Sequence, residues 1–326
     1  MSIVITSYNR DRFIAKAIES ALAQDYPNLE IIISDNCSTD NTDVVIKKYT
    51  HDARVKYFVN STNIGMIPNF KLATEEWAKG TFITYLSSDD YFCNNQFLSA
   101  AVNLINSYPD IVLVAAKNST LLHEKNELKE DDTDHVFQKE FCPGVEMFKL
   151  FPEWFAPGWG AVVMQRDKLI KTKAFESKAQ SMDYEANLKL MLQGNLAFIK
   201  QTSYVFRRHA LQASGNMNTD VQINNLAFIE NTCAFAKKIN KDIDIENWRQ
   251  QVYYAYLNGI ARRLITKKDE LLKILKYVKK EKKISISFIK SPKYFTLFKI
   301  YKNYNKISFL LKIFYPGLYN AIEKDK

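Results

Sequence analysis

The chain has 326 residues, of which 47% are hydrophobic and 25% are charged, and its formal net charge is +9. These values are typical of a soluble globular protein with one large domain and an appendage. No run of about 18 apolar residues occurs, and the first residues lack the basic and long apolar stretches of a secretory signal, so we expect neither a membrane-spanning helix nor a leader.

The first part of the chain alternates short apolar runs with longer helical patterns. Strands are predicted at residues 2–8, 29–35, 55–60, 81–86 and 110–117. Helices are predicted between them at residues 11–24, 41–50, 66–80 and 95–109. This alternation indicates βαβ units, and hence an α/β fold whose mostly parallel sheet is covered by helices on both faces.

The pattern is weaker in the second part of the chain. Residues 123–135 are predicted to form a solvated loop, and residues 157–169 a Gly-rich turn followed by a strand and a helix. An amphipathic helix is predicted at 181–195 and strands at 196–209. Beyond residue 217 the pattern is nearly all helical.

Charge divides the chain unevenly. Residues 261–326 hold 18 Lys and Arg against 5 Asp and Glu, whereas residues 1–260 hold 27 against 31. Such a basic tail favours an anionic membrane surface or nucleic acid. No nucleic-acid-binding motif occurs, so we expect no nucleic acid partner, although charge alone permits one.

The tail itself has a pattern that suits a membrane surface. On a helical wheel, residues 293–307 gather aromatic side chains on one side and lysines on another, and residues 307–319 are apolar nearly all round. We expect an interfacial segment on an anionic bilayer; the alternative is a helix docked on the body of the protein. The four cysteines have no paired spacing, which argues against zinc and disulfides and fits a reducing cytoplasm.

Polar residues cluster where the predicted strands end. These segments read TSYNR (6–10), SDNCSTD (34–40), NSTNIG (60–65) and SSDDYF (87–92). Each of them alone suits a helix cap, but four together favour a polar ligand at the carboxyl edge of the sheet. Neither a P-loop nor a GxGxxG motif occurs, so a cation at Asp89 or Asp90 would have to neutralise a bound diphosphate.

Five segments, in this order, resemble glycosyltransferase family 2: VITSYNR, DYPNLEIIISDNCSTDNT, NIGMIPNFKLA, GTFITYLSSDDYF and MDYEANLKL. The resemblance covers residues 1–215 and leaves 216–326 as a helical, basic C-terminal region. It implies a GT-A fold, which is Rossmann-like, a nucleotide-diphosphate sugar as donor, Mn²⁺ or Mg²⁺, and inversion at the anomeric carbon.

The resemblance also implies roles for single residues. Nucleotide-binding positions are implied at Thr6, Tyr8, Asn9, Asp35, Asn36, Asn63, Ser87 and Ser88. Two of them depart from the family pattern. Asn36 stands where a second Asp is common, and Ser87 stands at the first Asp of the Asp-x-Asp metal motif.

The remaining implied positions concern metal, catalysis and acceptor. Metal ligands are implied at Asp89, Asp90 and His209, and the catalytic base at Asp183. An inverting displacement needs one carboxylate to take the proton of the acceptor hydroxyl. Acceptor contacts are implied at Trp159 and at Glu185, which is also the fallback base. The alternatives are helix caps for the two aspartates at 89 and 90, a dipole-stabilising acid for Asp183, and structural roles for His209 and Trp159.

We therefore expect a metal-dependent hexosyl- or N-acetylhexosaminyltransferase of bacterial surface-polysaccharide assembly. O-antigen or other lipopolysaccharide, capsule and cell-wall glycan are the expected products. The expected donor is a UDP-sugar and the acceptor a lipid-linked saccharide at the cytoplasmic face of the membrane. Two alternatives stay open: a nucleotidyl- or phosphoryl-transferring enzyme on a similar sheet, and a non-catalytic protein that binds sugar nucleotides.

Overall fold

The computed structural model describes residues 1–130, 138–151, 158–210, 212, 218–239, 242–263 and 268–284. The chain forms two compact units. The first comprises Met1–Asn216 and Asn224–Ile245, and the second comprises Met217–Ile223 and Glu246–Lys326. The predicted boundary at residue 215 divides the chain differently, because it leaves residues 224–245 with the C-terminal region.

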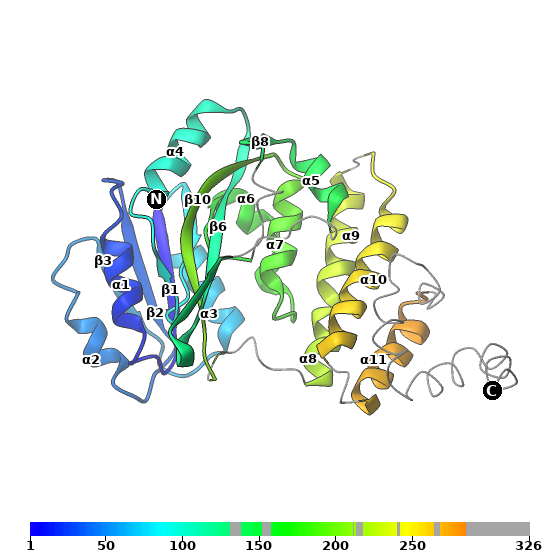
Figure 1. Ribbon diagram of the computed structural model, residues 1–326, viewed down its shortest axis with the longest axis horizontal. Helices are drawn as coiled ribbons and strands as arrows, with labels where there is room; N and C mark the ends of the chain where they lie inside the picture. Colours follow the sequence, from blue (N-terminus) through cyan, green and yellow to red (C-terminus); the bar gives the residue numbers. More distant parts are fainter. Residues whose placement is uncertain are drawn as a thin grey trace, which may run out of the picture. The chain divides into compact units, whose positions relative to one another are not determined.

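The first unit is built on one sheet, which has ten strands in the described residues (Figure 1). The main strand order is β3-β2-β1-β4-β9-β6-β10-β5, with β7 beside β6 and β8 beside β10. The strands are β1 Ser2–Ser7, β2 Glu30–Asp35, β3 Val55–Val59, β4 Phe82–Tyr85, β5 Tyr91–Phe92, β6 Ile111–Leu122, β7 Glu127–Glu130, β8 Phe141–Cys142, β9 Val162–Gln165 and β10 Asn195–Arg208. Strands β3, β2, β1 and β4 are parallel, as are β6 and β10. Strand β9 is antiparallel to both of its neighbours.

Helices cover both faces of this sheet. One group shares a hydrophobic core with Ile3 and Ile5 of β1: α1 Ile14–Leu22, α2 Thr42–Lys47 and α4 Phe97–Ser107. Side chains alternate along a strand, so Val4 faces the opposite side. Helices that contact the sheet or its flanking helices elsewhere are α3 Met66–Leu72, α5 Gly144–Leu150, α6 Arg166–Lys171 and α7 Met182–Met191. The predicted α/β architecture is confirmed.

Two predicted segments differ from the structure. Strand β6 continues to Leu122 and turns into the antiparallel strand β7, so part of the predicted loop at 123–135 is an exposed hairpin. The sequence did not predict β7, because all four of its side chains are exposed and show no alternation of apolar and polar residues. Helix α7 is buried on nearly all sides from Glu185 to Met191 instead of being amphipathic, because α9 (Ala227–Ile239) packs against it.

The second unit is helical in its described residues, as predicted. Helix α8 spans Thr219–Asn225, α10 spans Ile245–Arg263 and α11 spans Lys268–Glu281. Apolar side chains of α11, such as Ile274 and Val278, are buried. None of the helices in the described part of the chain is long and apolar enough to cross a membrane. The interfacial segment predicted within 285–326 lies outside the described residues.

Candidate active site

The polar loops predicted from the sequence meet at one edge of the sheet. They follow β1, β2, β3 and β4, which run parallel, so their carboxyl ends point the same way. Backbone hydrogen bonds join neighbouring loops: the N–H of Asn36 donates to the Ser7 carbonyl at 2.8 Å, and that of Asn60 donates to the Asp35 carbonyl at 2.9 Å. These bonds hold the loops of three strands in a fixed arrangement.

The loop after β1 presents one ring and uses one amide as a brace. Tyr8 is 41% exposed, whereas Thr6 is partly buried. Asn9 has a left-handed backbone with φ of 52°, a conformation that Asn tolerates better than most residues. Its side-chain oxygen accepts the N–H of Thr39 at 2.8 Å, and its own N–H donates to Ser38 Oγ at 2.8 Å. Asn9 therefore ties the β1 loop to the β2 loop and leaves the Tyr8 ring accessible to a ligand.

Asp35 lies at the end of β2 and is almost fully buried. Its carboxylate accepts the Ser38 hydroxyl at 2.5 Å and the Ser38 N–H at 3.2 Å. Burial raises the pKa of Asp35, although the Ser38 hydrogen bonds oppose this shift. Asp35 therefore lies at the carboxyl edge of the sheet.

Asn36 is engaged inside the protein. Its Nδ2 donates to Asn63 Oδ1 at 2.8 Å, and its Oδ1 accepts the side chain of Asn60 at 3.0 Å and the N–H of Ile64 at 3.0 Å. Asn63 Oδ1 also accepts the N–H of Gly65. Asn36 was predicted to meet a nucleobase, but these contacts instead give it the task of shaping the loop after β3, and Asn63 shares that task.

The turn after β4 sends its two aspartates in different directions. It is closed by the N–H of Asp90, which donates to the Ser87 carbonyl at 3.0 Å. Ser87 is partly exposed and Ser88 is buried. Asp90 is 1% exposed, and burial, followed by repulsion from Asp89, raises its pKa well above the usual range of an aspartate. The two aspartates therefore point in different directions: Asp90 points into the protein, and Asp89 points toward the edge of the sheet.

Asp89 faces His209, which follows β10. His209 Nε2 lies 3.0 Å from Asp89 Oδ2, and Arg10 Nε lies 3.5 Å from the same oxygen. The His209 ring packs against Phe13, with ring centroids 4.5 Å apart. The structure therefore brings together two of the three predicted metal ligands.

Asp90, the third predicted metal ligand, has other partners. Its Oδ2 accepts the Tyr204 hydroxyl at 2.6 Å, and its Oδ1 accepts the N–H of Arg207 at 2.7 Å. Both oxygens are thus committed to β10. In this arrangement Asp90 differs from the expectation that it faces a cation.

Asp183, the predicted base, lies in the first turn of α7. Its Oδ1 accepts the N–H of Tyr184 at 2.9 Å. Burial raises its pKa to about 6. The position that a Cβ would take at Gly158 lies 3.4 Å from Asp183 Oδ2, so the glycine of the predicted acceptor-side turn adjoins this carboxylate. A carboxylate with a pKa close to neutral is suited to taking a proton.

Trp159 lies in an aromatic cluster. Its ring stacks on Tyr85 with centroids 4.3 Å apart, and it also contacts Phe70 and Phe175. The indole Nε1 is buried and has no hydrogen-bond partner. These contacts give Trp159 the structural role that was the alternative to stacking on a sugar, although the ring is only partly buried.

Glu185 differs from its predicted acceptor-side role. Its side chain is 1% exposed and forms an ion pair with Lys189 at 2.5 Å. Its second oxygen accepts the Asn231 amide at 3.1 Å. The carboxylate is therefore enclosed between α7 and α9, because a buried charge is retained only where it is paired.

Four residues of the site were not predicted: Arg10, Phe13, Tyr204 and Arg207. The last two lie on β10 upstream of His209, and Phe13 precedes α1. Residues two apart on a strand share a face, so the spacing of Arg207 and His209 was the available signal. Sequence gives no comparable signal for the contact of Arg10 with Asp89.

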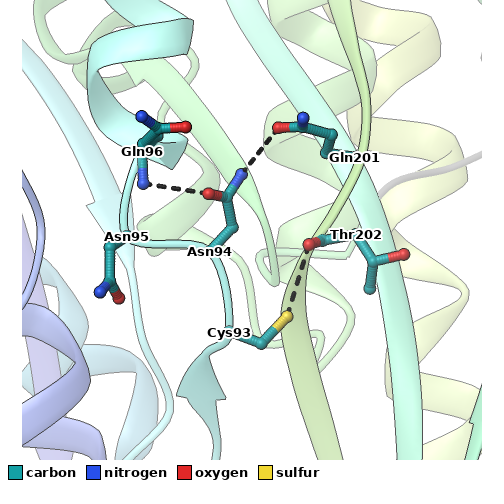
Figure 2. A pocket seen from close by; sticks show the side chains of 6 residues that line it. All are labelled: Cys93, Asn94, Asn95, Gln96, Gln201 and Thr202. Atoms are coloured by element: carbon teal, nitrogen blue, oxygen red, sulfur yellow. Dashed lines mark hydrogen bonds between the residues drawn. The ribbon is translucent and has the colours of Figure 1, made fainter.

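A separate open pocket of about 580 Å³ lies between the turn after β5 and the middle of β10 (Figure 2). Its lining is polar and uncharged: Cys93, Asn94, Asn95, Gln96, Gln201 and Thr202. Asn94 donates to Gln201 across it at 3.3 Å. None of the predicted site residues is among the six.

Comparison with known proteins identifies a family that resembles part of the chain. The profile of "Glycosyl transferase family 2" matches residues 2–126, which include all four polar loops, the Asp89 turn among them. Residues 2–126 are therefore similar to glycosyltransferase family 2.

Two curated family 2 relatives illustrate the match. The chain is 28% identical over 118 residues to the poly(ribitol-phosphate) beta-N-acetylglucosaminyltransferase TarS of Staphylococcus aureus, covering 36% of this chain and 21% of TarS. It is 36% identical over 107 residues to the GalNAc(5)-diNAcBac-PP-undecaprenol beta-1,3-glucosyltransferase of Campylobacter jejuni, covering 32% of this chain and 33% of that protein. The chain thus matches only about a fifth to a third of the length of these two relatives.

The solved structures support the fold. The structure of S. aureus TarS 1–349 in complex with UDP-GlcNAc has a TM-score of 0.62 and 18% identity, and the match covers 80% of this chain and 72% of that one. At this identity the likeness concerns the fold alone. The first unit has a GT-A-like fold, with a mixed, mostly parallel sheet.

Proposed function

We propose that the chain is an inverting glycosyltransferase that moves a sugar from a UDP-sugar to a hydroxyl of a saccharide acceptor. The observation that carries this proposal is the contact between Asp89 and His209 at the ligand-binding edge of a family 2 sheet. The TarS structure with UDP-GlcNAc supports a nucleotide-sugar donor of hexosamine type. The similarity to the C. jejuni glucosyltransferase, which is named for an undecaprenol-linked acceptor, supports a lipid-linked acceptor in the assembly of bacterial surface polysaccharide.

The residues near Asp89 suit a divalent cation. No group of three His, Cys, Asp or Glu in the described part of the chain is arranged to hold a metal by itself. Asp89 and His209 nevertheless offer one oxygen and one nitrogen, and a Mn²⁺ or Mg²⁺ site completed by diphosphate oxygens and water needs few protein ligands. When bound there, the cation would offset the negative charge of the diphosphate.

Asp183 supplies the proton transfer. Its carboxylate takes the proton of the acceptor hydroxyl while the acceptor oxygen bonds to the anomeric carbon. The bond between that carbon and the diphosphate oxygen breaks with its electron pair, and the nucleoside diphosphate leaves. Arg10 adds positive charge beside Asp89, and the exposed Tyr8 ring offers a surface for a nucleobase.

We also propose that the protein acts at the cytoplasmic face of the membrane and attaches to it peripherally. Helix α11 supports this, because its apolar side is buried while a stripe of lysines is exposed: Lys273, Lys276 and Lys280. Each lysine near an anionic bilayer contributes about 1 kcal/mol of attraction. The basic residues of 285–326 continue this charge in the sequence.

A panel of nucleotide sugars, tested for thermal stabilisation with and without Mn²⁺, examines the donor. A ligand at about 100-fold its Kd adds about 2.7 kcal/mol to the free energy of unfolding. We expect stabilisation by a UDP-sugar, and release of intact UDP when an acceptor is added. Release of pyrophosphate or phosphate would indicate a nucleotidyl- or phosphoryl-transferring enzyme, and binding without turnover would indicate a non-catalytic protein.

A further inference from the structure

Asp90 closes a gap in the pairing between β5 and β10. The two strands are antiparallel, with Tyr91 opposite Val205 and Phe92 opposite Tyr204. Extending this register by two residues places Asp89 opposite Arg207. The N–H of Arg207 donates instead to the Asp90 side chain at 2.7 Å. A carboxylate oxygen thus takes the ladder position of the Asp89 carbonyl, which frees residue 89 to leave the strand and enter the turn.

The second oxygen of Asp90 fastens the same strand again. It accepts the Tyr204 hydroxyl at 2.6 Å, in an environment where Asp90 is 1% and Tyr204 is 2% exposed. Both hydrogen bonds are buried, and a hydrogen bond inside a protein is electrostatically stronger than one in water. They fix the turn that carries Asp89 to the strand that ends at His209.

Aromatic packing holds the end of β10 from the other side. The guanidinium of Arg207 lies 5.1 Å from the centre of the Phe13 ring and 5.5 Å from that of Tyr91. Phe13 also contacts the His209 ring. The Arg207 backbone is therefore held by Asp90 while its side chain is held by two rings. His209, two residues further along, is left with little freedom to move away from Asp89.

We propose that Asp90 is a positioning residue: it is the latch that sets Asp89 and His209 at the distance needed to hold a divalent cation together, and it does not bind the cation. This inference rests on the proposed function, because it concerns the cation that the transferase would use. It separates two adjacent aspartates by role. Asp89 must be a carboxylate, whereas Asp90 needs only two hydrogen-bonding atoms in the right places.

Three substitutions at these positions test the latch. Asp90→Ala removes both bonds, and loss of such a supporting partner lowers metal affinity about 10–100-fold. Asp90→Asn keeps an oxygen for the Arg207 N–H and offers an amide N–H to the Tyr204 oxygen, so it should recover most of what Asp90→Ala loses. Asp89→Asn should lose affinity for the cation as Asp90→Ala does, because an amide cannot replace the carboxylate that binds the cation. Affinity for Mn²⁺ with UDP is measured by titration calorimetry, and equal losses in Asp90→Asn and Asp89→Asn would make Asp90 a cation ligand and overturn the proposal.

A second measurement uses the protein without metal or nucleotide. It therefore tests the role of Asp90 even if the proposed function is wrong. We expect amide hydrogen exchange at Arg207 to be at least about 10-fold faster in Asp90→Ala than in the parent, and the His209 ring resonances to shift. In Asp90→Asn both should stay close to parental values. Unchanged exchange and unchanged His209 resonances in Asp90→Ala would overturn the latch.

Tyr204→Phe keeps the test valid if Asp90→Ala does not fold. It retains the ring and removes only the hydroxyl that donates to Asp90, and we expect Mn²⁺ affinity to fall several-fold and the His209 resonances to shift. Its matched control is Tyr49→Phe, which removes a tyrosine–carboxylate hydrogen bond to Glu19 at 2.9 Å on an exposed surface. Equal behaviour of the two variants would show that Tyr204 is merely structural and would overturn the proposal.

Discussion

His209 and Asp89 are 120 residues apart in the sequence, yet the imidazole Nε2 lies 3.0 Å from the carboxylate Oδ2. The contact joins the end of β10 to the turn after β4. It is enclosed, since the side chains of His209 and Asp89 are 3% and 16% exposed. An enclosed pair of this kind can hold an imidazole and a carboxylate in place before a ligand arrives, which limits the entropy lost on binding.

Asp89→Ala should abolish Mn²⁺-dependent binding of a nucleoside diphosphate and leave the fold intact, because Asp89 serves a ligand and not the core. Loss of the cation removes several kcal/mol of stabilisation from the leaving group. Titration calorimetry with UDP and Mn²⁺ measures the binding, and circular dichroism checks the fold. Asp167→Ala is the control, since Asp167 is an exposed aspartate whose partner is Arg166. Parental binding by Asp89→Ala would refute the metal assignment.

Asp183→Asn should lower turnover by about 10²–10⁴ with little change in donor affinity, because an amide cannot take a proton. In the parent, burial raises the pKa of Asp183 to about 6, so kcat/KM should fall as pH drops below that value and level off above it. The variant should lack this acid limb. A pH–rate profile measured on both proteins decides, and an identical acid limb would assign the proton transfer to another group.

The raised pKa of Asp183 also makes the free energy of unfolding depend on pH. A carboxyl whose folded pKa is raised holds its proton more tightly in the folded state, so its favourable contribution is present at low pH and is lost as pH rises through about 6. Asp183→Asn removes the cost of burying the charge. The variant should therefore unfold at an equal or higher temperature than the parent at pH 7.5.

Strands β1 to β4, the first part of β6, and strands β9 and β10 were predictable, because apolar, β-branched runs such as those of β1 and β2 favour a strand. The position of the ligand-binding edge was also predictable, because the carboxyl ends of parallel strands lie at the same edge of a sheet. The hairpin of β6 and β7 was not predictable, because side chains that all face solvent carry no alternation of burial. Hydrophobic periodicity indicates a strand only where one of its faces is buried, and β7 has no buried face.

The site was predictable in part. Polar residues at strand ends, together with the family resemblance, indicated Asp89 and His209. The hydrogen-bond partners of the site residues were not predictable. A bond such as that between Asp90 and Tyr204 depends on how distant strands pair, and not on local sequence. For the same reason the sequence could not distinguish Glu185, which is enclosed with Lys189, from an acid that faces a ligand.

Asn36→Asp, which restores the acid common in the family, should weaken this protein. The new oxygen would face Asn63 Oδ1, where the Asn36 amide now donates at 2.8 Å, and would add a charge beside the buried Asp35. Leaving buried acceptors without a donor costs about 1–3 kcal/mol. Chemical denaturation should show this loss, and affinity for UDP should fall.

Asn103→Asp is the control for Asn36→Asp, since it adds the same charge on an exposed position of α4. It should leave stability and nucleotide binding near parental values. An Asn36→Asp protein that binds UDP more tightly than the parent would show that residue 36 contacts the base directly, as the family resemblance implies.

Glu185→Gln should destabilise the fold by about 3–5 kcal/mol, because it leaves the Lys189 ammonium buried without its counter-charge. Turnover per folded molecule should be unchanged. Replacing both residues by methionine should recover most of the stability, since the pair is then removed as a unit. Urea denaturation measures the effect. A stable Glu185→Gln variant with low turnover would return Glu185 to its predicted role as a base.

The lysine stripe of α11 should govern attachment to anionic membranes. Changing Lys273, Lys276 and Lys280 to glutamine keeps helix propensity and removes three charges, each contributing about 1 kcal/mol at such a surface. We expect the full chain to co-sediment with anionic liposomes at low salt and to be released at high salt, because screening weakens attraction between exposed charges. The variant should sediment less at low salt while still binding UDP. A full chain that ignores anionic liposomes, or a variant that sediments as well as the parent, would assign these lysines to solvent alone.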